Sequence, residues 1–409
     1  MATPFGPLFP EVTATTLNEL IDGYIFQNSY VGTPFQRYFR ASGAYDPFGG
    51  GAGMQVPQLY QGAPGGAMFP GEDVTIVQPQ MITASVFQPK SYGKYCLVNE
   101  FVTEVQNKGP EARVGILEAY LNQMMEGIDF QLEGDMFRHG QAAGNGVSDN
   151  RLASINGISE AQNDGVTPSW DGNVFPTYGG QARNGAVDGS LNSTPIWLGD
   201  QNGNPAPPNY QTLLKTYMTP IANGGDKLGV TSYIGYSAIA SAFQRQQRYE
   251  TRDDQDINWS GIKFENATIF QDDIVPSSSP KPSIANLFTT VNGTAPAPGA
   301  IQTGQFTLTT AMLANQGISN LPSLGFTSNA TKNGLSGGSN VIVVGEPLFW
   351  ITPDVWKYRE AEGAPVNYHF MDPARWPENP WLYVQWLRHV LNFYNPTPRE
   401  DQQCYGILG

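Results

Sequence analysis

Between residues 110 and 139, apolar side chains recur at intervals of three and four residues. The repeat comprises Val114, Leu117, Leu121, Met124, Met125, Ile128, Leu132 and Met136. This spacing follows the 3.6-residue period of an α-helix and places these side chains on one face. Pro110 suits a first helical position, Arg138 and His139 suit a last turn, and Gly140 suits a stop. The pattern predicts a helix over residues 110–139, about 45 Å long at roughly 1.5 Å per residue, which acts as a spine for other elements.

The chain before this helix changes from arm-like to strand-like. Residues 1–55 are rich in Pro, Gly and aromatic residues, and Thr16 with Glu19 forms a capping-box pattern. We expect an extended arm that carries one short helix and packs on another surface. Three short runs with strand character follow, interrupted at Pro79 and Pro89. These runs are residues 74–77, 82–87 and 95–98. Together they predict a protruding β-hairpin that returns to the base of the long helix.

The chain after the helix alternates between polar loops and short regular segments. Residues 140–208 and 277–339 are crowded with Gly, Asn, Ser and Pro, and the first of these stretches has few apolar anchors. We expect both to be loop-rich. Helices are predicted at 210–218 and 237–248, and strands at 228–234, 264–275, 305–310, 340–352 and 383–394.

Composition and charge exclude some classes of function. The chain has 409 residues, with 36 Asp and Glu against 22 Lys and Arg, for a formal net charge of −14. A protein that grips nucleic-acid phosphates needs clustered basic residues, so tight nucleic-acid binding is disfavoured. The first basic residue is Arg37, so a basic leader is not expected, and no apolar run is long enough to span a membrane. Two cysteines, Cys96 and Cys404, exclude a disulfide framework and favour an intracellular origin.

Several motifs suggest chemistry, but each has a plainer explanation. Ser336 lies in a G-x-S-x-G match without the strand and helix that a nucleophile elbow needs. The series from Asp254 to Glu265 imitates a calcium loop but has Trp259 where Gly is required. The three histidines, His139, His369 and His389, lack metal-type spacing.

The tryptophan-rich C-terminal third offers one further catalytic candidate. Asp354, Glu360 and Glu362 lie near tryptophans and suggest a glycosidase pair, although sequence does not give the separation that such a pair requires. Core or interface anchoring is the favoured role for these tryptophans. They are Trp350, Trp356, Trp376, Trp381 and Trp386. We therefore predict no catalytic, cofactor-binding or metal-binding residues.

Taken in order, these segments resemble the major capsid protein of tailed bacteriophages, which has the Hong Kong 97-type fold. The resemblance rests on an ordered series and not on one motif. The stretches are FQPKSYGKYCLVNEFV (87–102), LEGDMFRHG (132–140), LASINGI (152–158), the helix–strand–helix region 210–248, IFQDDIVP (269–276) and VLNFYNP (390–396). The large stretches 140–208 and 277–339 depart from the family pattern, and we expect them to mark outer-surface or cement-protein sites.

The resemblance implies an α+β subunit divided into named parts. An N-terminal arm takes residues 1–55, and an E-loop hairpin takes 56–94. A P-domain takes 95–208, with the spine helix 110–139 and the insertion 140–208. An A-domain takes 209–375, and residues 376–409 return to the P-domain.

The resemblance also implies a structural function with no enzymatic activity and no cofactor. Copies of the chain would form hexamers and pentamers of an icosahedral head around double-stranded DNA, assembled in the host cytoplasm and located in the virion. Further partners would be scaffolding, portal and cement or decoration proteins, with weak, non-specific DNA contacts and no membrane. The residues agree, because an arm and a hairpin too extended to be stable alone should bury their area on neighbours.

Two alternatives stay open. One is an encapsulin-like nanocompartment shell, which packaged protein in place of nucleic acid would reveal. The other is a carbohydrate-active or glycan-binding β-rich protein that uses the tryptophan-rich C-terminal third.

Overall fold

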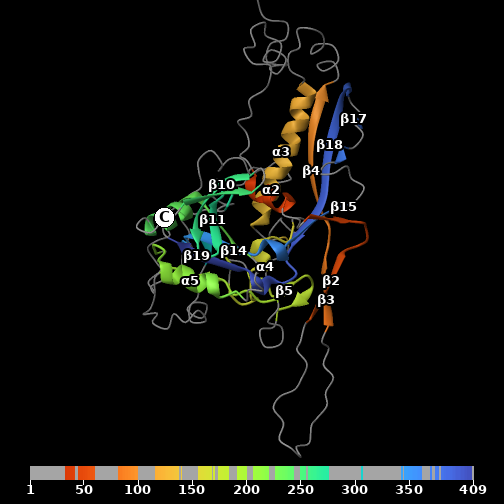
Figure 1. Ribbon diagram of the computed structural model, residues 1–409. Helices are drawn as coiled ribbons and strands as arrows, with labels where there is room; N and C mark the ends of the chain where they lie inside the picture. The colour runs from red at the N-terminus through yellow and green to blue at the C-terminus, as the bar shows by residue number, and fades with distance from the viewer. Residues whose placement is uncertain are drawn as a thin grey trace, which may run out of the picture.

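Two β-sheets and one long helix organise the subunit (Figure 1). The helix lies along a long, narrow sheet, and the second sheet is broader and more buried. A two-stranded hairpin extends from the narrow sheet at the end that the helix does not cover. The computed structural model describes residues 33–41, 45–59, 82–99, 116–137, 140, 155–167, 169–170, 174–183, 191–199, 206–220, 226–243, 249–254, 257–275, 305–306, 342–343, 345–361, 369–370, 374–376 and 379–407.

The narrow sheet is built around one strand, β18 (Asn379–Tyr394). The strand β4 (Lys90–Asn99) runs antiparallel to it, in register from Leu382 opposite Asn99 to Leu391 opposite Lys90. The segments predicted at 95–98 and 383–394 lie in these two strands. The remaining strands are β15 (Lys357–Ala361), β1 (Tyr45–Phe48), β16 (His369–Phe370) and β17 (Ala374–Trp376).

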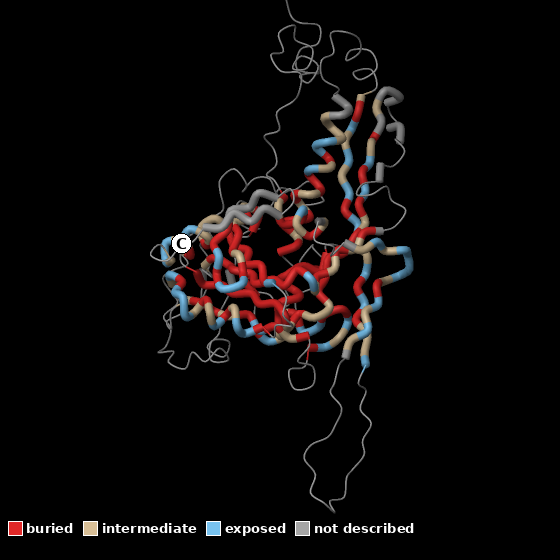
Figure 2. Tube along the Cα trace, in the orientation of Figure 1, coloured by how far each residue is buried: buried red, intermediate tan, exposed pale blue. Residues whose placement is uncertain are grey.

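The long helix α3 (Ile116–Met136) packs against β4 and β18 on one face of this sheet. The predicted apolar stripe is confirmed where side chains are described, and Figure 2 shows it as an interrupted red line along the helix. Met124, Ile128, Leu132 and Met136 are buried, whereas Leu121 is half-buried. Residues 110–115, 138 and 139 lie outside the described part, so the predicted ends of the helix stay predictions.

The broad sheet has its central strands buried on both faces. Strand β14 (Glu346–Ile351) shows why, because its alternate side chains enter two different cores. Phe349 and Ile351 face the core shared with α3, while Leu348 and Trp350 face a second core. The strands, in spatial order, are β7 (Ile196–Trp197), β19 (Gln402–Ile407), β14, β8 (Leu228–Thr231), β11 (Ala267–Gln271), β10 (Ile257–Phe264) and β9 (Tyr249–Asp254).

Two helices close the second core. Helix α5 (Tyr210–Met218) matches the predicted bounds, and the Asn209 side chain caps it by accepting from the backbone N–H of Thr212. Helix α6 (Tyr233–Ala242) begins earlier than predicted, because Ser232 accepts from the N–H of Gly235 and ends the strand at Thr231. The prediction of a strand through residue 234 was therefore wrong.

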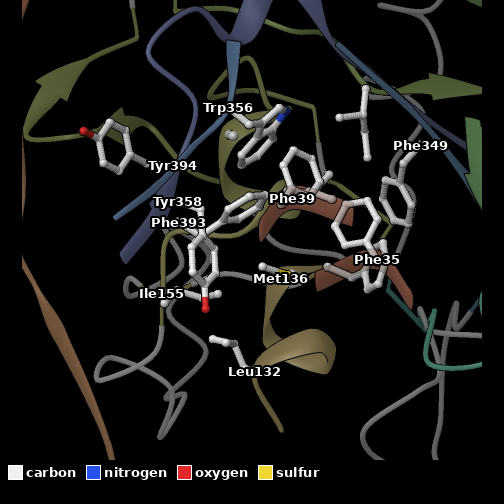
Figure 3. Packing of buried hydrophobic residues seen from close by; sticks show 14 of the residues in the cluster. Phe35, Phe39, Leu132, Met136, Ile155, Phe349, Trp356, Tyr358, Phe393 and Tyr394 are labelled. Carbon is white, nitrogen blue, oxygen red and sulfur yellow. The ribbon is translucent and has the colours of Figure 1, made fainter. Parts of the chain in front are cut away.

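The first core joins both sheets, α3 and a short helix that the sequence did not reveal, α2 (Pro34–Ala41). Figure 3 shows Phe35 and Phe39 of α2 pointing into this core toward Met136, Phe349 and Trp356. Phe35 lies 4.8 Å from Phe137, and Phe39 lies 5.1 Å from Phe393, measured between ring centroids. The predicted helix around Thr16 lies outside the described residues.

Two small hairpins lie beside one another at the base of the projecting part. Strands β2 (Met54–Leu59) and β3 (Ile82–Phe87) pair antiparallel, which confirms the strand predicted at 82–87. The strand predicted at 74–77 lies outside the described part. The second hairpin consists of β5 (Thr177–Tyr178) and β6 (Gln181–Ala182).

The described parts of residues 140–208 are far better anchored than predicted. They include the one-turn helix α4 (Ile158–Ala161) and side chains that are fully or almost fully buried in the cores. The expectation of few apolar anchors was wrong, because single aromatic residues separated by polar turns fill the space between the two sheets. These buried residues are Ile155, Ile158, Trp170, Phe175, Tyr178, Leu191, Trp197 and Leu198.

The strand predicted at 340–352 is divided. Gly345 adopts φ +71°, a left-handed conformation that suits glycine, and a side chain there would meet the backbone of Gly406. The chain forms β13 (Ile342–Val343), paired with β12 (Gln305–Phe306), and then β14 after this glycine. Among the described helices, none is long and apolar enough to cross a membrane.

Candidate functional site

The residues that the sequence offered for catalysis are placed as structural groups. His389 is buried, and its Nε2 lies 3.0 Å from Oε1 of Glu360. A guanidinium nitrogen of Arg40 lies 3.5 Å from the same carboxylate. Burial alone would raise the pKa of Glu360, but the hydrogen bond and charge of His389 and the charge of Arg40 outweigh it and lower that pKa. The three groups tie α2 to β15 and β18 inside the subunit.

The other candidate residues for catalysis or metal binding do not lie together in one site. Asp354 is exposed, whereas Glu360 is buried. Asp254 and Asn258 of the calcium-like series lie in β9 and β10, two strands that pair with one another, so they are not part of a calcium-binding loop. The described residues contain no cluster of three or more metal-ligating side chains. Glu362, Ser336 and His139 lie outside the described part, as does the side chain of His369.

The tryptophans of the C-terminal third whose side chains are described divide into two groups, and the side chains of Trp376 and Trp381 lie outside the described part. Trp350 and Trp356 are fully buried, and Trp356 stacks on Phe393 with ring centroids 4.3 Å apart. Its indole N–H donates to the buried carboxylate of Asp401, so the ring is fixed at both ends. These two rings belong to the core and offer no platform for a sugar. Trp386 is different, because it is 42% exposed.

Trp386 belongs to an apolar patch on the narrow sheet. It pairs directly across from Tyr95 of β4, with ring centroids 5.0 Å apart, and Tyr95 is 64% exposed. Leu97, two residues along β4, is also half exposed. The neighbouring residue Tyr92 points to the opposite face, where its hydroxyl donates to Asp135 of α3 at 3.0 Å. Strand alternation therefore places Tyr95, Leu97 and Trp386 on the face away from α3, and we call this set the open sheet face.

The open sheet face has the composition of a protein contact surface. Paired exposed aromatics on regular strands are rigid and lose little conformational freedom on binding. Contiguous apolar groups of this kind, unlike isolated exposed leucines, mark interaction sites. Sequence reasoning missed this face, since it is created by the register of two strands nearly three hundred residues apart. The available signal was the continuous apolar run 95–98 in β4, which strand alternation divides between the two faces of the sheet.

The hairpin β2–β3 is gripped at its base by the second hairpin. The N–H of Val86 donates to the carbonyl of Gly179 at 2.8 Å, and the side-chain amide of Gln181 donates to the carbonyl of Ala84 at 2.9 Å. Gly179 adopts φ +56°, and a Cβ there would lie 2.7 Å from the Cβ of Ser85. Only glycine allows the two hairpins to approach this closely.

The hairpin base is also fixed to the end of the narrow sheet. Phe87 stacks on Tyr394 at the end of β18, with centroids 4.2 Å apart and planes within 12°. The side-chain amide of Gln58 donates to the carbonyl of Pro396 at 2.7 Å. The hairpin therefore leaves the subunit in a set direction, while Ile82 and Val86 remain exposed on it.

Comparisons with known proteins bear on the fold. No protein-family model matches the chain, and no curated protein matches its sequence. The solved capsid chain of cyanophage A-1(L) matches with a TM-score of 0.56 at 9% identity, covering 97% of this chain and 99% of that one. The subunit therefore has the fold of a tailed-phage capsid protein, of the Hong Kong 97 type.

Two further solved structures score lower and add nothing to this conclusion. The capsid chain of a native GTA particle matches with a TM-score of 0.49 at 7% identity, covering 96% of this chain and 94% of that one. A chain of the holo-SrpI encapsulin complex from Synechococcus elongatus matches with a TM-score of 0.47 at 9% identity, covering 95% of this chain and 93% of that one.

Proposed function

We propose that this chain is the major capsid protein of a tailed phage and that its copies assemble into the icosahedral shell of the virion. The observation that carries the proposal is the open sheet face of Tyr95, Leu97 and Trp386, together with the fold. The packing of the two cores does not explain why a pair of aromatic side chains is exposed to water. Coverage by other copies gives that reason.

The gripped hairpin supports the same proposal. Among the described residues, β2 and β3 form a two-stranded sheet of their own, and an isolated two-stranded hairpin is marginally stable in water. The base contacts of Gln58, Phe87 and Gly179 set its direction, which is useful where the projecting part must meet a neighbouring copy. We expect pentamers and hexamers, because an icosahedral shell needs pentamers at its vertices and a shell larger than the smallest one fills the area between them with hexamers.

The charge of the chain fits a container for double-stranded DNA. At −14, the subunit as a whole repels phosphate, so contacts with a packaged genome would be weak and independent of sequence. Scaffolding, portal and cement or decoration proteins are the further partners that we propose. The role is structural, with no reaction assigned to the chain.

Expression of the full chain, alone and with a scaffolding partner, tests the proposal. We expect closed shells or capsomer rings in negative-stain electron micrographs. A species that stays at 44.5 kDa under all assembly conditions would contradict it. Shells that package a protein and exclude nucleic acid would instead support the encapsulin-like alternative.

A further inference from the structure

A buried carboxylate accepts from the first backbone N–H groups of helix α2. Pro34 is the first residue of the helix and Thr33 precedes it, and the first turn contains no acidic residue. Its first free backbone donors are the N–H groups of Phe35 and Gln36. Both donate to the Glu133 carboxylate of α3, at 3.1 Å and 3.4 Å. Glu133 is fully buried, so this contact fastens α2 to the middle of the subunit.

A second buried carboxylate lies against the first. Asp272 follows β11, and its backbone N–H donates to the carbonyl of Thr231 at 3.0 Å. One carboxylate oxygen accepts from the N–H of Ile274 at 2.8 Å. The other, Oδ2, is buried and has no donor among the described residues. The side-chain carboxyl groups of Asp272 and Glu133 are in hydrogen-bond contact with one another.

Two carboxylates in contact and out of water satisfy each other only if they share a proton. The proton supplies the donor that Oδ2 of Asp272 lacks. Burial raises the pKa of Glu133, and the charge of Asp272 raises it further. Burial also raises the pKa of Asp272, to about 6. The two groups titrate as a pair, and the loss of the last proton leaves two negative charges in the core.

Among the described residues, the charges near the pair do not compensate that loss. Asp273, next in the chain, adds negative charge and raises the pKa of Asp272. On α2, Arg37 acts on Glu126, which is exposed, and Arg40 is held by Asp129 and Glu360 at 3.5 Å each. Asp129 lies one turn before Glu133 on α3 and accepts from Gln36 and Arg40. The nearby groups on α3 and after β11 are therefore further carboxylates, those of Asp129 and Asp273. The cations of α2 interact with other acidic groups.

We propose that Glu133 and Asp272 form a proton-operated latch that holds α2 against α3 and β11 while one proton is shared, and releases α2 when both carboxylates are ionised. Acids whose pKa is raised by folding stabilise the folded form below their unfolded pKa, and this contribution is lost as pH rises through the folded pKa. The latch is thus closed in mild acid and opens on the alkaline side. The inference concerns the subunit itself and does not depend on shell formation.

Hydrogen–deuterium exchange of the full chain from pH 6 to 9 tests the latch. The readout is the protection of α2 amides, normalised to those of α5, which corrects for the general acceleration of exchange by base. In the wild-type chain, α2 protection should fall about tenfold per pH unit above the upper pKa of the pair. Asp272→Asn keeps the acceptor for Ile274 and supplies a permanent donor to Glu133, so its α2 protection should stay constant. Asp273→Asn, the matched control, should retain the pH response.

Two results would overturn the proposal: a wild-type ratio of α2 to α5 protection that does not change with pH, or an Asp272→Asn variant that loses protection as the wild type does. Glu133→Gln also removes the titratable group, but its single side-chain oxygen serves only one of the N–H groups of Phe35 and Gln36, so its α2 protection should be lower than in the wild type and should not change with pH. If either variant fails to fold, the other and the wild-type series still decide. A capsid assignment that proved wrong would leave these exchange results unchanged, so the two proposals fail separately.

Discussion

Removal of the aromatic pair from the open sheet face should impair assembly while leaving the subunit folded. The perturbation is the double variant Tyr95→Ser, Trp386→Ser. In the subunit these side chains are 64% and 42% exposed, and their rings contact one another. A cross-strand aromatic pair contributes about 0.5–1.5 kcal/mol to a folded chain. The free energy of unfolding should therefore fall by that amount together with the burial that Trp386, more than half buried, loses on replacement by serine.

The effect on association should be larger. Aromatic side chains bury roughly 150–250 Å² each, so a neighbour that covers the exposed parts of both would remove about 200 Å² from water. At about 25 cal/mol per Å² this is worth ~5 kcal/mol. Side-chain ordering and polar desolvation offset part of it, which leaves ~2–4 kcal/mol per contact. The association constant of each contact should then fall about 30- to 700-fold.

The assay compares two measurements on the same preparations. Thermal unfolding of unassembled subunits reports on the fold, and the protein concentration at which particles first scatter light reports on association. Tyr95→Phe, Trp386→Phe retains the aromatic surface and should assemble nearly as the wild type does. A serine variant that assembles at the wild-type concentration would refute the view that this face is a contact between copies. So would a serine variant that does not fold, because the pair would then be a core element.

Three other predictions test the remaining parts of the structure. Gly179→Ala, with a Cβ forced 2.7 Å from that of Ser85, should loosen the hairpin base and raise proteolysis between residues 60 and 81, whereas an unchanged cleavage rate would show that the grip is not needed. Leu132→Asp, in the fully buried stripe of α3, should prevent folding as judged by circular dichroism, since loss of the buried side chain alone costs about 2–5 kcal/mol and the charge adds to it; Gln123→Asp on the exposed face is the control. Deletion of residues 1–30 should leave a folded subunit that assembles poorly by sedimentation, and normal shells from it would show that this segment is not an inter-subunit clamp.

Elements with a local signal were the ones that the sequence predicted well. The stripe of α3 follows helical periodicity, and α5 is bounded by its own cap at Asn209 and by Pro220. Leu121 shows the limit of such reasoning. It lies on the predicted stripe but is only half-buried, since the pattern gives the face of a helix and not the depth to which a neighbour covers it. For this reason Leu132 is the sharper test of the buried stripe.

Features that depend on distant partners were not predictable. Helix α2 has no acidic residue in its first turn, and the group that caps it, Glu133, lies 98 positions from Phe35. The open sheet face depends on which residue of β18 lies opposite Tyr95. The start of α6 is a different case, because the cap at Ser232 was present in the sequence but the apolar run before it favoured a longer strand.

The central claim is that this chain is a shell subunit whose exposed faces are covered by other copies. Electron cryomicroscopy of the purified assembly tests it most directly. We predict closed icosahedral particles in which Tyr95 and Trp386 of each copy are covered by a neighbouring copy. Particles in which both rings face solvent, or a protein that remains a single subunit of 44.5 kDa with and without scaffold, would contradict the claim.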